Sequence, residues 1–198
     1  MTKREEQKEQ RRNDILNAAL DLFVKNGYGA TRIVDIVERA TISMGLLFHY
    51  FGSKEQLYHE LIRKGYDTIN FDLTGEGSPM TIFGGIAERI FKQLEEEPNT
   101  GKLFVLLGEA LRNDSIPAAS KELMAHIHLV DRSVPLIEKG QALGEIRQGD
   151  SLALALVFWD AIQGIAERVA VNPEMPSPEV NWILAILRKE SSQEGEKP

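Results

Sequence analysis

The sequence contains no cysteine, which excludes disulfides, thiol catalysis and zinc sites with cysteine ligands. It also lacks a long apolar run: the longest, Leu152–Trp159, is far shorter than the ~20 residues that a membrane-spanning helix needs. The N-terminus is charged and has no apolar core of the kind that a secretion signal carries. These absences predict a cytoplasmic protein without a membrane partner.

The charge of the chain is unevenly distributed. The formal net charge of −7 is unfavourable for contact with a polyanion. Residues 1–64, however, carry 11 basic and 9 acidic side chains, whereas residues 65–198 carry 12 and 21. Such an asymmetry indicates two parts with separate roles, of which only the first is suited to binding nucleic acid.

Apolar residues recur with helical spacing along nearly the whole chain, and no segment keeps the alternation of a β-strand. The pattern predicts an all-α fold of about nine helices. The first is expected to run from Arg12 to Asn26 and to end at Gly27. Glycines and a proline between Asp72 and Pro79 mark the clearest joint in the chain.

Two short helices joined by a three-residue turn are predicted after the first helix. Thr31 is expected to cap the first of them, Ser43 the second (MGLLFHY), and Ser53 the connecting helix that follows. This arrangement is a helix-turn-helix, whose second helix enters the major groove of B-DNA and meets base edges with its N-terminal residues.

The string ATRIVDIVERATISMGLLFHYFGSKEQL, residues 30–57, closely resembles the TetR family of bacterial transcription regulators. The positions that carry the resemblance are Thr31, Ile36, Ala40, Ser43, Gly45, His49, Tyr50, Phe51, Lys54, Glu55 and Leu57. So many matches in fewer than thirty residues are far more specific than a lone short motif. The resemblance implies a homodimer that binds a double-stranded DNA operator and responds to an unknown small-molecule effector.

Three residues depart from the usual family pattern. Thr41 stands where the turn normally has glycine; a positive φ there costs of the order of 1 kcal/mol or more, so a slightly remodelled turn is expected. Met44 replaces a basic residue after the cap, and Phe48 replaces a tyrosine. Recognition is therefore expected to depend on apolar contacts of Met44 or Leu46 and on the backbone of Gly45.

The predicted DNA-binding residues surround this turn and open the connecting helix: Thr31, Arg32, Ser43, Met44, Gly45, Leu46, Phe48, His49, Tyr50 and Lys54. The family places Lys54 beside a DNA phosphate, whereas Phe51 is assigned to the core. Basic residues of the N-terminal arm are expected to add phosphate-binding charge: Lys3, Arg4, Lys8, Arg11 and Arg12. The same charged run is also compatible with a solvated tail.

The segment 152–170 is apolar on nearly all sides, so one face can meet the core and another a second copy of the chain. A predicted last helix over 178–189 can join it in a four-helix bundle between subunits. Its apolar stripe consists of Val180, Ile183, Leu184 and Leu187. Aromatic or polar residues on apolar helices are the candidate effector site: Phe104, Leu107, Arg112, His126, Trp159 and Gln163.

The favoured interpretation is a transcription regulator, a repressor that a small hydrophobic effector releases from a palindromic operator. Its parts are a helix-turn-helix DNA-binding domain over 1–53, a connecting helix over 54–74, and a ligand-binding and dimerisation domain over 75–198. No cofactor, metal or enzyme activity is expected, since no P-loop, dinucleotide fingerprint or serine elbow is present. The alternative is an all-α small-molecule-binding protein or enzyme in which the helix-turn-helix is only structural.

Overall fold

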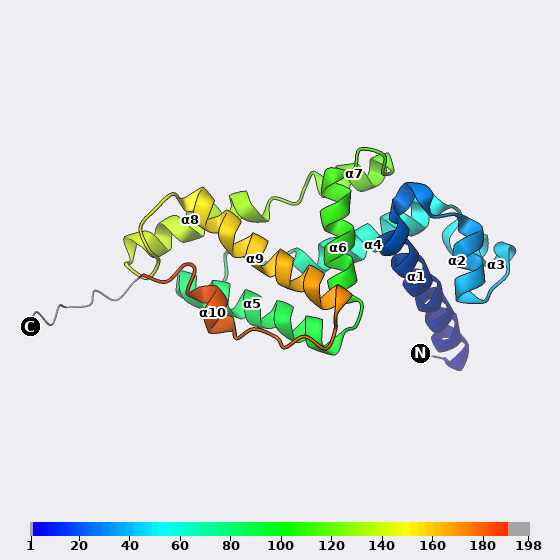
Figure 1. Ribbon diagram of the computed structural model, residues 1–198, viewed down its shortest axis with the longest axis horizontal. Coiled ribbons are helices and arrows are strands. Elements are labelled where there is room, and N and C mark those ends of the chain that lie inside the picture. The colour runs from blue at the N-terminus through cyan, green and yellow to red at the C-terminus, as the bar shows by residue number, and fades with distance from the viewer. Residues whose placement is uncertain (1, 190–198) are drawn as a thin grey trace, which may run out of the picture. The chain divides into compact units, whose positions relative to one another are not determined.

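A computed structural model of the chain describes residues 2–189, which fold into α-helices joined by short loops (Figure 1). In chain order the helices are α1 (Lys3–Ala30), α2 (Ile33–Ala40), α3 (Met44–Phe51), α4 (Lys54–Ile69), α5 (Pro79–Glu96), α6 (Thr100–Arg112), α7 (Ala118–Met124), α8 (Leu129–Ala142), α9 (Ser151–Val171) and α10 (Val180–Leu184). The only strand-like pairing in residues 2–189 is an isolated bridge between Ile146 and Arg188. The prediction of an all-α fold is confirmed.

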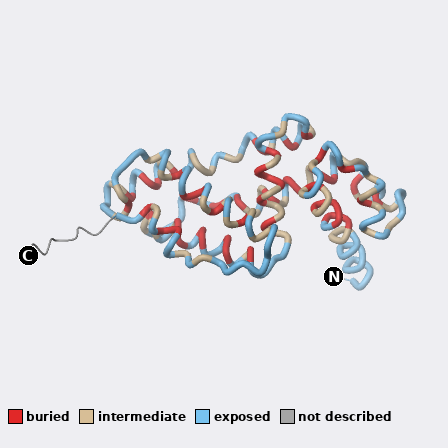
Figure 2. Tube along the Cα trace, in the orientation of Figure 1, coloured by how far each residue is buried: buried red, intermediate tan, exposed pale blue. Residues whose placement is uncertain are grey.

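The helices pack into two compact units, each with its own buried residues (Figure 2). Among the described residues, unit 1 consists of the chain up to Asn70 together with Glu97–Ile127 and Ala166–Pro173, and unit 2 consists of Phe71–Glu96, His128–Ile165 and residues 174–189. Helices α6 and α7 thus pack with the first four helices, although the predicted boundary lies before them. This grouping describes packing, and the functional division into 1–53, 54–74 and 75–198 stays a prediction.

The first four helices enclose a small apolar core. Its members are Ile15, Ala19, Phe23, Ile36, Leu47, Phe51, Leu57 and Leu61. Tyr58 of α4 meets Phe23 of α1 edge to face, with ring centroids 5.1 Å apart. Such an aromatic pair adds to the stability that apolar burial provides, so α1 and α4 are joined firmly. The burial of Phe51 agrees with its assignment to the core rather than to DNA.

Helix α1 starts at Lys3 rather than near Arg12, because a capping box closes its N-terminus. Thr2 Oγ1 accepts a hydrogen bond from the Glu5 N–H, and the Glu5 carboxylate accepts one from the Thr2 N–H at 2.7 Å. The Thr2 backbone and side chain hold the pKa of Glu5 below its usual value. The N-terminal arm, residues 3–14, is therefore helix rather than a tail.

Unit 2 is held together by an aromatic cluster between α9 and its neighbours. The cluster contains Phe71, Phe83, Phe158 and Trp159. The Trp159 indole N–H donates to Ser133 Oγ of α8 at 2.9 Å, so the polar atom of this buried side chain is satisfied. Although α9 is long and apolar, the described part of the chain contains no helix able to cross a membrane.

The last helix is shorter than predicted. Helix α10 ends at Leu184, not at residue 189, and a turn follows. The backbone after it pairs with the loop that precedes α9: the Arg147 N–H donates to Leu187 O at 2.8 Å, and the Lys189 N–H donates to Glu145 O. This pairing, which sequence spacing does not reveal, takes the backbone of the last predicted turn out of the helix.

Candidate nucleic-acid interface

The turn between α2 and α3 contains a residue in the left-handed conformation. Thr41 has φ 53° and ψ 51°, and its N–H donates to Glu38 O at the end of α2. The backbone therefore takes the conformation that glycine normally supplies at a helix C-terminus, rather than remodelling the turn to suit a β-branched residue. Holding threonine in this conformation costs about 1–2 kcal/mol.

Helix α3 is fixed at both ends by the residues that the sequence predicted as caps and breaks. Ser43 Oγ accepts a hydrogen bond from the Leu46 N–H at 3.2 Å. Gly52 ends the helix with φ 69°, and Ser53 then caps α4 by accepting from the Gln56 N–H. An eight-residue helix is marginal alone, so these caps and the core beneath decide where α3 lies.

One face of α3 is turned away from the core. Leu47 and Phe51 point inward, whereas the opposite face, called the readout face here, consists of Met44, Gly45, Phe48 and His49. Met44 is 40% exposed and Phe48 43%. No lysine, arginine, aspartate or glutamate occurs between Met44 and Phe51, so the surface that α3 offers is uncharged when His49 is neutral.

Leu46 and Tyr50, two further predicted DNA-binding residues, are half-buried at the edge of this face. The Tyr50 ring lies against His49, with centroids 5.6 Å apart. Leu46 is thus less available for apolar contact than Phe48. The sequence had favoured Met44 or Leu46, and the structure instead exposes the pair Met44 and Phe48.

Thr31 is not the cap of α2. Its side chain is buried, and Oγ1 lies 2.8 Å from Gly27 O and 3.1 Å from Leu22 O, so the hydroxyl closes the end of α1. The hydroxyl is therefore not accessible to DNA in this structure. The N-cap position belongs to Arg32, an exposed side chain that forms an ion pair with Asp35 at 2.6 Å.

Lys54 lies at the start of α4, as predicted, but its ammonium group is turned toward the protein. Nζ donates to Tyr28 O and Thr31 O, both at 3.0 Å, and lies 4.3 Å from the centroid of the Tyr28 ring. The Tyr28 hydroxyl donates to Glu55, and burial together with this carboxylate raises the pKa of Tyr28 to about 12. Lys54 therefore positions α4 against the end of α1, and the phosphate contact that the sequence predicts has to compete with these two carbonyls.

The N-terminal arm runs beside the recognition helix α3. Arg4, Lys8 and Arg11 line an open groove of about 710 Å³ whose other wall includes His49 and Tyr50. In residues 2–189 the structure shows no hydrogen bond or ion pair for the side chains of Arg4 and Lys8, and the Arg11 pair with Asp14 is long at 3.9 Å. These cations are available to a phosphate backbone next to the readout face.

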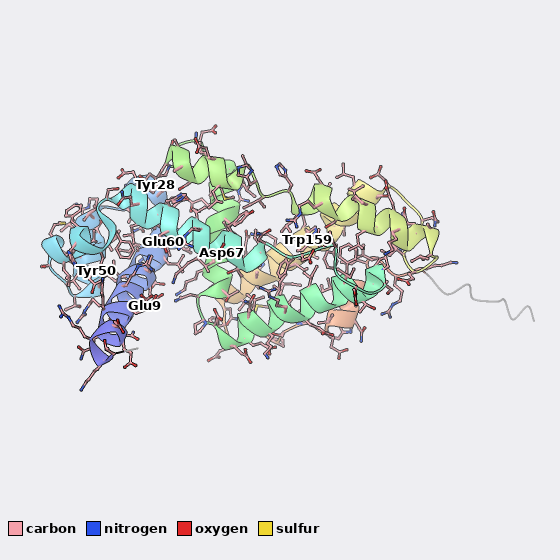
Figure 3. All side chains as sticks on the ribbon, turned by 180° about the vertical axis from the view of Figure 1, so that it is seen from behind. Glu9, Tyr28, Tyr50, Glu60, Asp67 and Trp159 are labelled. Carbon is pink, nitrogen blue, oxygen red and sulfur yellow. The ribbon has the colours of Figure 1, made fainter. Side chains whose placement is uncertain are left out.

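Arg12 differs from the other arm cations. It forms an ion pair with Glu60 of α4 at 2.8 Å and lies over the Phe51 ring, 5.2 Å from its centroid. These two contacts give Arg12 a structural role within unit 1. A second groove beside Tyr50 is lined by Glu5 and Glu9 as well as by Lys8 and Arg12, so acidic side chains offset the positive charge there (Figure 3, at Glu9 and Tyr50).

A shared carboxylate joins three helices of unit 1. Asp21 of α1 accepts hydrogen bonds from Arg39 of α2 at 3.2 Å and from Lys102 of α6 at 2.6 Å. Burial alone would raise the pKa of Asp21, but the hydrogen bonds from Lys102 and Arg39 outweigh it and lower the pKa. The partners are too far apart in sequence for any local pattern to predict this link.

Four of the six predicted effector-site residues lie in unit 1. Phe104 and Leu107 are buried on α6, and Leu107 fills the space beside Gly65 of α4, where an added Cβ would approach it to 3.0 Å. Arg112 and His126, by contrast, are exposed. Leu107 thus serves the packing of α6 on α4, and the four side chains do not share one environment.

The other two, Trp159 and Gln163, lie on the part of α9 that belongs to unit 2. Trp159 is buried with its N–H on Ser133, and Gln163 is half-buried. Neither unit alone brings all six residues together, so an effector site at these positions stays a prediction. Across the described residues, no three histidine or carboxylate side chains gather as a metal site would require.

Helix α9 has the two apolar faces that the sequence predicted. Ala155, Phe158 and Ile162 are buried. On the other side Leu152, Leu156 and Val157 are exposed and form an apolar surface, called the α9 face here. Large exposed apolar surfaces on one helix mark a site of interaction.

Comparison with known proteins agrees with this architecture. The family model for bacterial regulatory proteins of the tetR family matches residues 15–61. The HTH-type transcriptional regulator RutR of Escherichia coli (strain K12) is 30% identical over 159 residues, which cover 77% of this chain and 72% of the relative. An uncharacterized HTH-type transcriptional regulator of Bacillus subtilis, YfiR, is 27% identical over 82% of this chain and 81% of its own length.

Solved structures share the fold at lower identity. The ketosteroid transcriptional regulator KstR2 of Mycobacterium tuberculosis superposes with a TM-score of 0.74 at 22% identity, over 91% of this chain and 96% of the other. The MbdR regulator of Azoarcus sp. CIB gives 0.70 at 23% identity, over 89% and 97%. The matched residues 15–61 contain the capped α3 and its core, and the relatives extend the similarity over most of the chain. The chain belongs to the tetR family of bacterial regulatory proteins and is a helix-turn-helix transcriptional regulator.

Proposed function

We propose that this regulator is a homodimer that binds a palindromic operator and represses transcription until a small hydrophobic effector releases it. The readout face of α3 carries the proposal. In a helix-turn-helix the N-terminal residues of the second helix meet base edges in the major groove. Met44 and Gly45 are the first two residues of α3, and both are exposed.

Affinity for the DNA backbone comes from outside α3 in this proposal. Arg4, Lys8 and Arg11 lie along the arm beside the readout face, and the exposed Arg32 lies at the start of α2. Cations in such positions bind phosphates without reading sequence and release counterions from the DNA. The acidic net charge of the whole chain does not prevent this, because the acidic excess lies after residue 64.

The α9 face supports the homodimer. Leu152, Leu156 and Val157 expose apolar surface over two turns, and a twofold axis would place each of these surfaces against its own copy. A dimer formed in this way carries two recognition helices related by the twofold axis, and a palindromic site matches that symmetry. Trp182 of α10 is also exposed and is available to the same interface.

An apolar effector is proposed for the C-terminal part, residues 75–198. One structural relative is described as a ketosteroid transcriptional regulator, which supports a hydrophobic ligand class. A ligand that prefers the state unable to bind DNA weakens operator binding by its difference in affinity for the two states. The Asp21 link supports such coupling, since a shift of Lys102 on α6 alters the contact of Arg39 on α2.

The test of DNA binding is a titration of the full chain on double-stranded DNA at several salt concentrations. The logarithm of the binding constant is expected to fall linearly with the logarithm of salt. Lys8→Gln should reduce this slope by about one, whereas Lys92→Gln, an exposed lysine of unit 2, should leave it unchanged. Absence of binding to any duplex at low salt would contradict the proposal.

The effector is approached separately. Native mass spectrometry of the purified protein reports the mass of any retained small molecule. Adding that molecule back to the protein–operator complex should release DNA. If the retained molecule leaves the protein–operator complex intact, it is not the effector.

A further inference from the structure

Apart from His49, the readout face carries no charged, amide or hydroxyl side chain of the kind with which proteins commonly read bases. We infer that α3 reads thymine methyl groups, with Met44 and Phe48 each covering one methyl and Gly45 allowing the helix to approach the base edges. This inference rests on the proposed binding of an operator. It specifies what the operator half-site must contain.

The chemistry of the major groove leads to thymine. The groove edges of guanine, cytosine and adenine present hydrogen-bonding atoms, and the C5-methyl of thymine is the apolar group among them. Met44 and Phe48 have no N–H or O–H to donate. Placing them against polar base atoms would remove water from those atoms without replacing the hydrogen bonds, which is unfavourable, whereas covering a methyl is favourable.

The spacing of the two side chains sets the spacing of the methyls. Met44 and Phe48 are four residues apart on one face, which separates them by about 6 Å along the helix. This distance equals roughly two base-pair steps of 3.4 Å. The half-site should therefore present two thymine methyls about two steps apart, on either strand.

Gly45 gives an independent reason for close approach. A Cβ added at Gly45 would meet no atom of the protein within 4 Å, so packing does not require glycine there. Glycine destabilises a helix relative to alanine, and α3 has only eight residues. A role for glycine at this position therefore has to come from a partner outside the described residues, and a missing side chain next to Met44 would let the backbone reach the groove.

Deoxyuridine provides the first experiment, because it lacks only the methyl of thymidine. A duplex that the full-length protein selects from a random-sequence pool is resynthesised with uracil at one thymine at a time. Two positions in each half-site, about two steps apart, should each lose about fourfold in affinity, the amount expected for one buried methyl. Met44→Ala should abolish the difference between thymine and uracil at one position, and Phe48→Ala at the other.

The control for these variants is Leu111→Ala. Leu111 is an exposed apolar residue at the end of α6, outside the helix-turn-helix, and its removal should leave both uracil effects intact. Thermal melting of each variant checks that the fold is retained, since Met44 and Phe48 are exposed and their truncation leaves the core unchanged.

Gly45→Ala provides the second experiment. This variant should melt at the same or a higher temperature than the parent and yet bind the selected duplex at least tenfold more weakly, with little change on scrambled DNA. Gly85→Ala is the matched control, because Gly85 is an exposed helical glycine of α5 with equally open surroundings. It should leave DNA binding unchanged.

The outcomes separate this inference from the proposed function. If the protein binds every uracil-substituted duplex as tightly as the original duplex, the methyl readout is overturned and operator binding remains in place. Persistence of both uracil effects in Met44→Ala and Phe48→Ala overturns the assignment of these side chains. Failure to bind or select any duplex at low salt contradicts the proposed function itself.

Discussion

Helices α3 and α9 both expose apolar side chains along one face, but they differ in length, anchoring and electrostatic surroundings. Helix α3 has eight residues, is capped at both ends and belongs to the part of the chain with a small positive charge. Helix α9 has 21 residues and lies in the acidic part. Exposed apolar surface alone therefore does not identify a partner.

The length of each helix and the charge around it indicate different partners for α3 and α9. Helix α3 is about 12 Å long, comparable to the width of the major groove, and basic side chains lie beside it. Helix α9 is about 31 Å long, which suits packing along another helix, and an acidic surrounding disfavours DNA. The same kind of surface is thus assigned to DNA on α3 and to a second copy of the chain on α9.

The largest effect is expected for Leu156→Glu. A carboxylate at the centre of the α9 face would be buried without a counter-charge and would meet its own copy across a twofold axis. The dissociation constant of the dimer should rise at least about 100-fold, which corresponds to roughly 3 kcal/mol. Equilibrium sedimentation measures it, with Leu111→Glu as the exposed control. An unchanged dissociation constant would show that the α9 face is not the dimer interface, and the proposed difference in partner between α3 and α9 would then be wrong.

Lys54→Met tests the contacts that hold the start of α4, the helix after α3, against the end of α1. The variant leaves Tyr28 O and Thr31 O without their shared ammonium donor, at an expected cost of about 1.5–3 kcal/mol in the free energy of unfolding. The salt slope of DNA binding should stay unchanged. Urea denaturation and salt titration give the two readouts, and Lys25→Met, an exposed position on α1, is the control. A slope reduced by one with unaltered stability would instead establish a phosphate contact.

Lys102→Met tests the link between α6 and the helix-turn-helix. Loss of the hydrogen bond to Asp21 should destabilise unit 1 by about 1 kcal/mol at neutral pH. The folded-state pKa of Asp21 is lowered, so this contribution is present above its unfolded pKa and is lost as pH falls through the folded value. The difference between variant and parent should shrink toward that acidic range. A difference independent of pH would show that the carboxylate is not responsible.

The smallest effect is expected for Thr41→Gly. Glycine adopts the left-handed conformation without the steric cost that threonine carries, but it loses more entropy on folding. The net gain should be about 0.5–1 kcal/mol in urea denaturation. Operator affinity should not change, because Thr41 lies in the turn rather than on the readout face. A destabilised variant would mean that Thr41 makes a contact stronger than its strain.

Local signals explain why much of the helix-turn-helix was predictable. Ser43 and Ser53 cap the helices expected of them, and Gly27 interrupts α1 where the sequence indicates. Each of these signals acts within four residues, so it is visible in the sequence. The capping box at Thr2 acts over the same distance, yet the polar arm lacks an apolar stripe and its helix was not anticipated.

Competing partners account for the rest, and in two of the three cases the partner is distant in sequence. Thr31 has the chemistry of an N-cap, but a carbonyl of the preceding helix takes its hydroxyl. Lys54 has the position of a phosphate ligand, but the end of α1 offers it two carbonyls. The stripe after Val180 has helical spacing, and backbone pairing with the loop before α9 ends the helix early. In each case another partner competes with the role that the local pattern predicts.

The uncharged surface of α3 also bears on how the regulator searches the genome. Sliding along DNA depends on cations that hold the phosphate backbone, and the proposal assigns this role to the arm and to Arg32. Helix α3 contributes none of this attraction. We expect α3 to shorten the residence time of the protein at incorrect sites. At such sites no methyl meets Met44 or Phe48, and polar base edges would lose water without gaining hydrogen bonds. In the proposed mode of binding, the speed of search and the choice of site depend on different residues, so a changed readout face should redirect the protein without slowing its search.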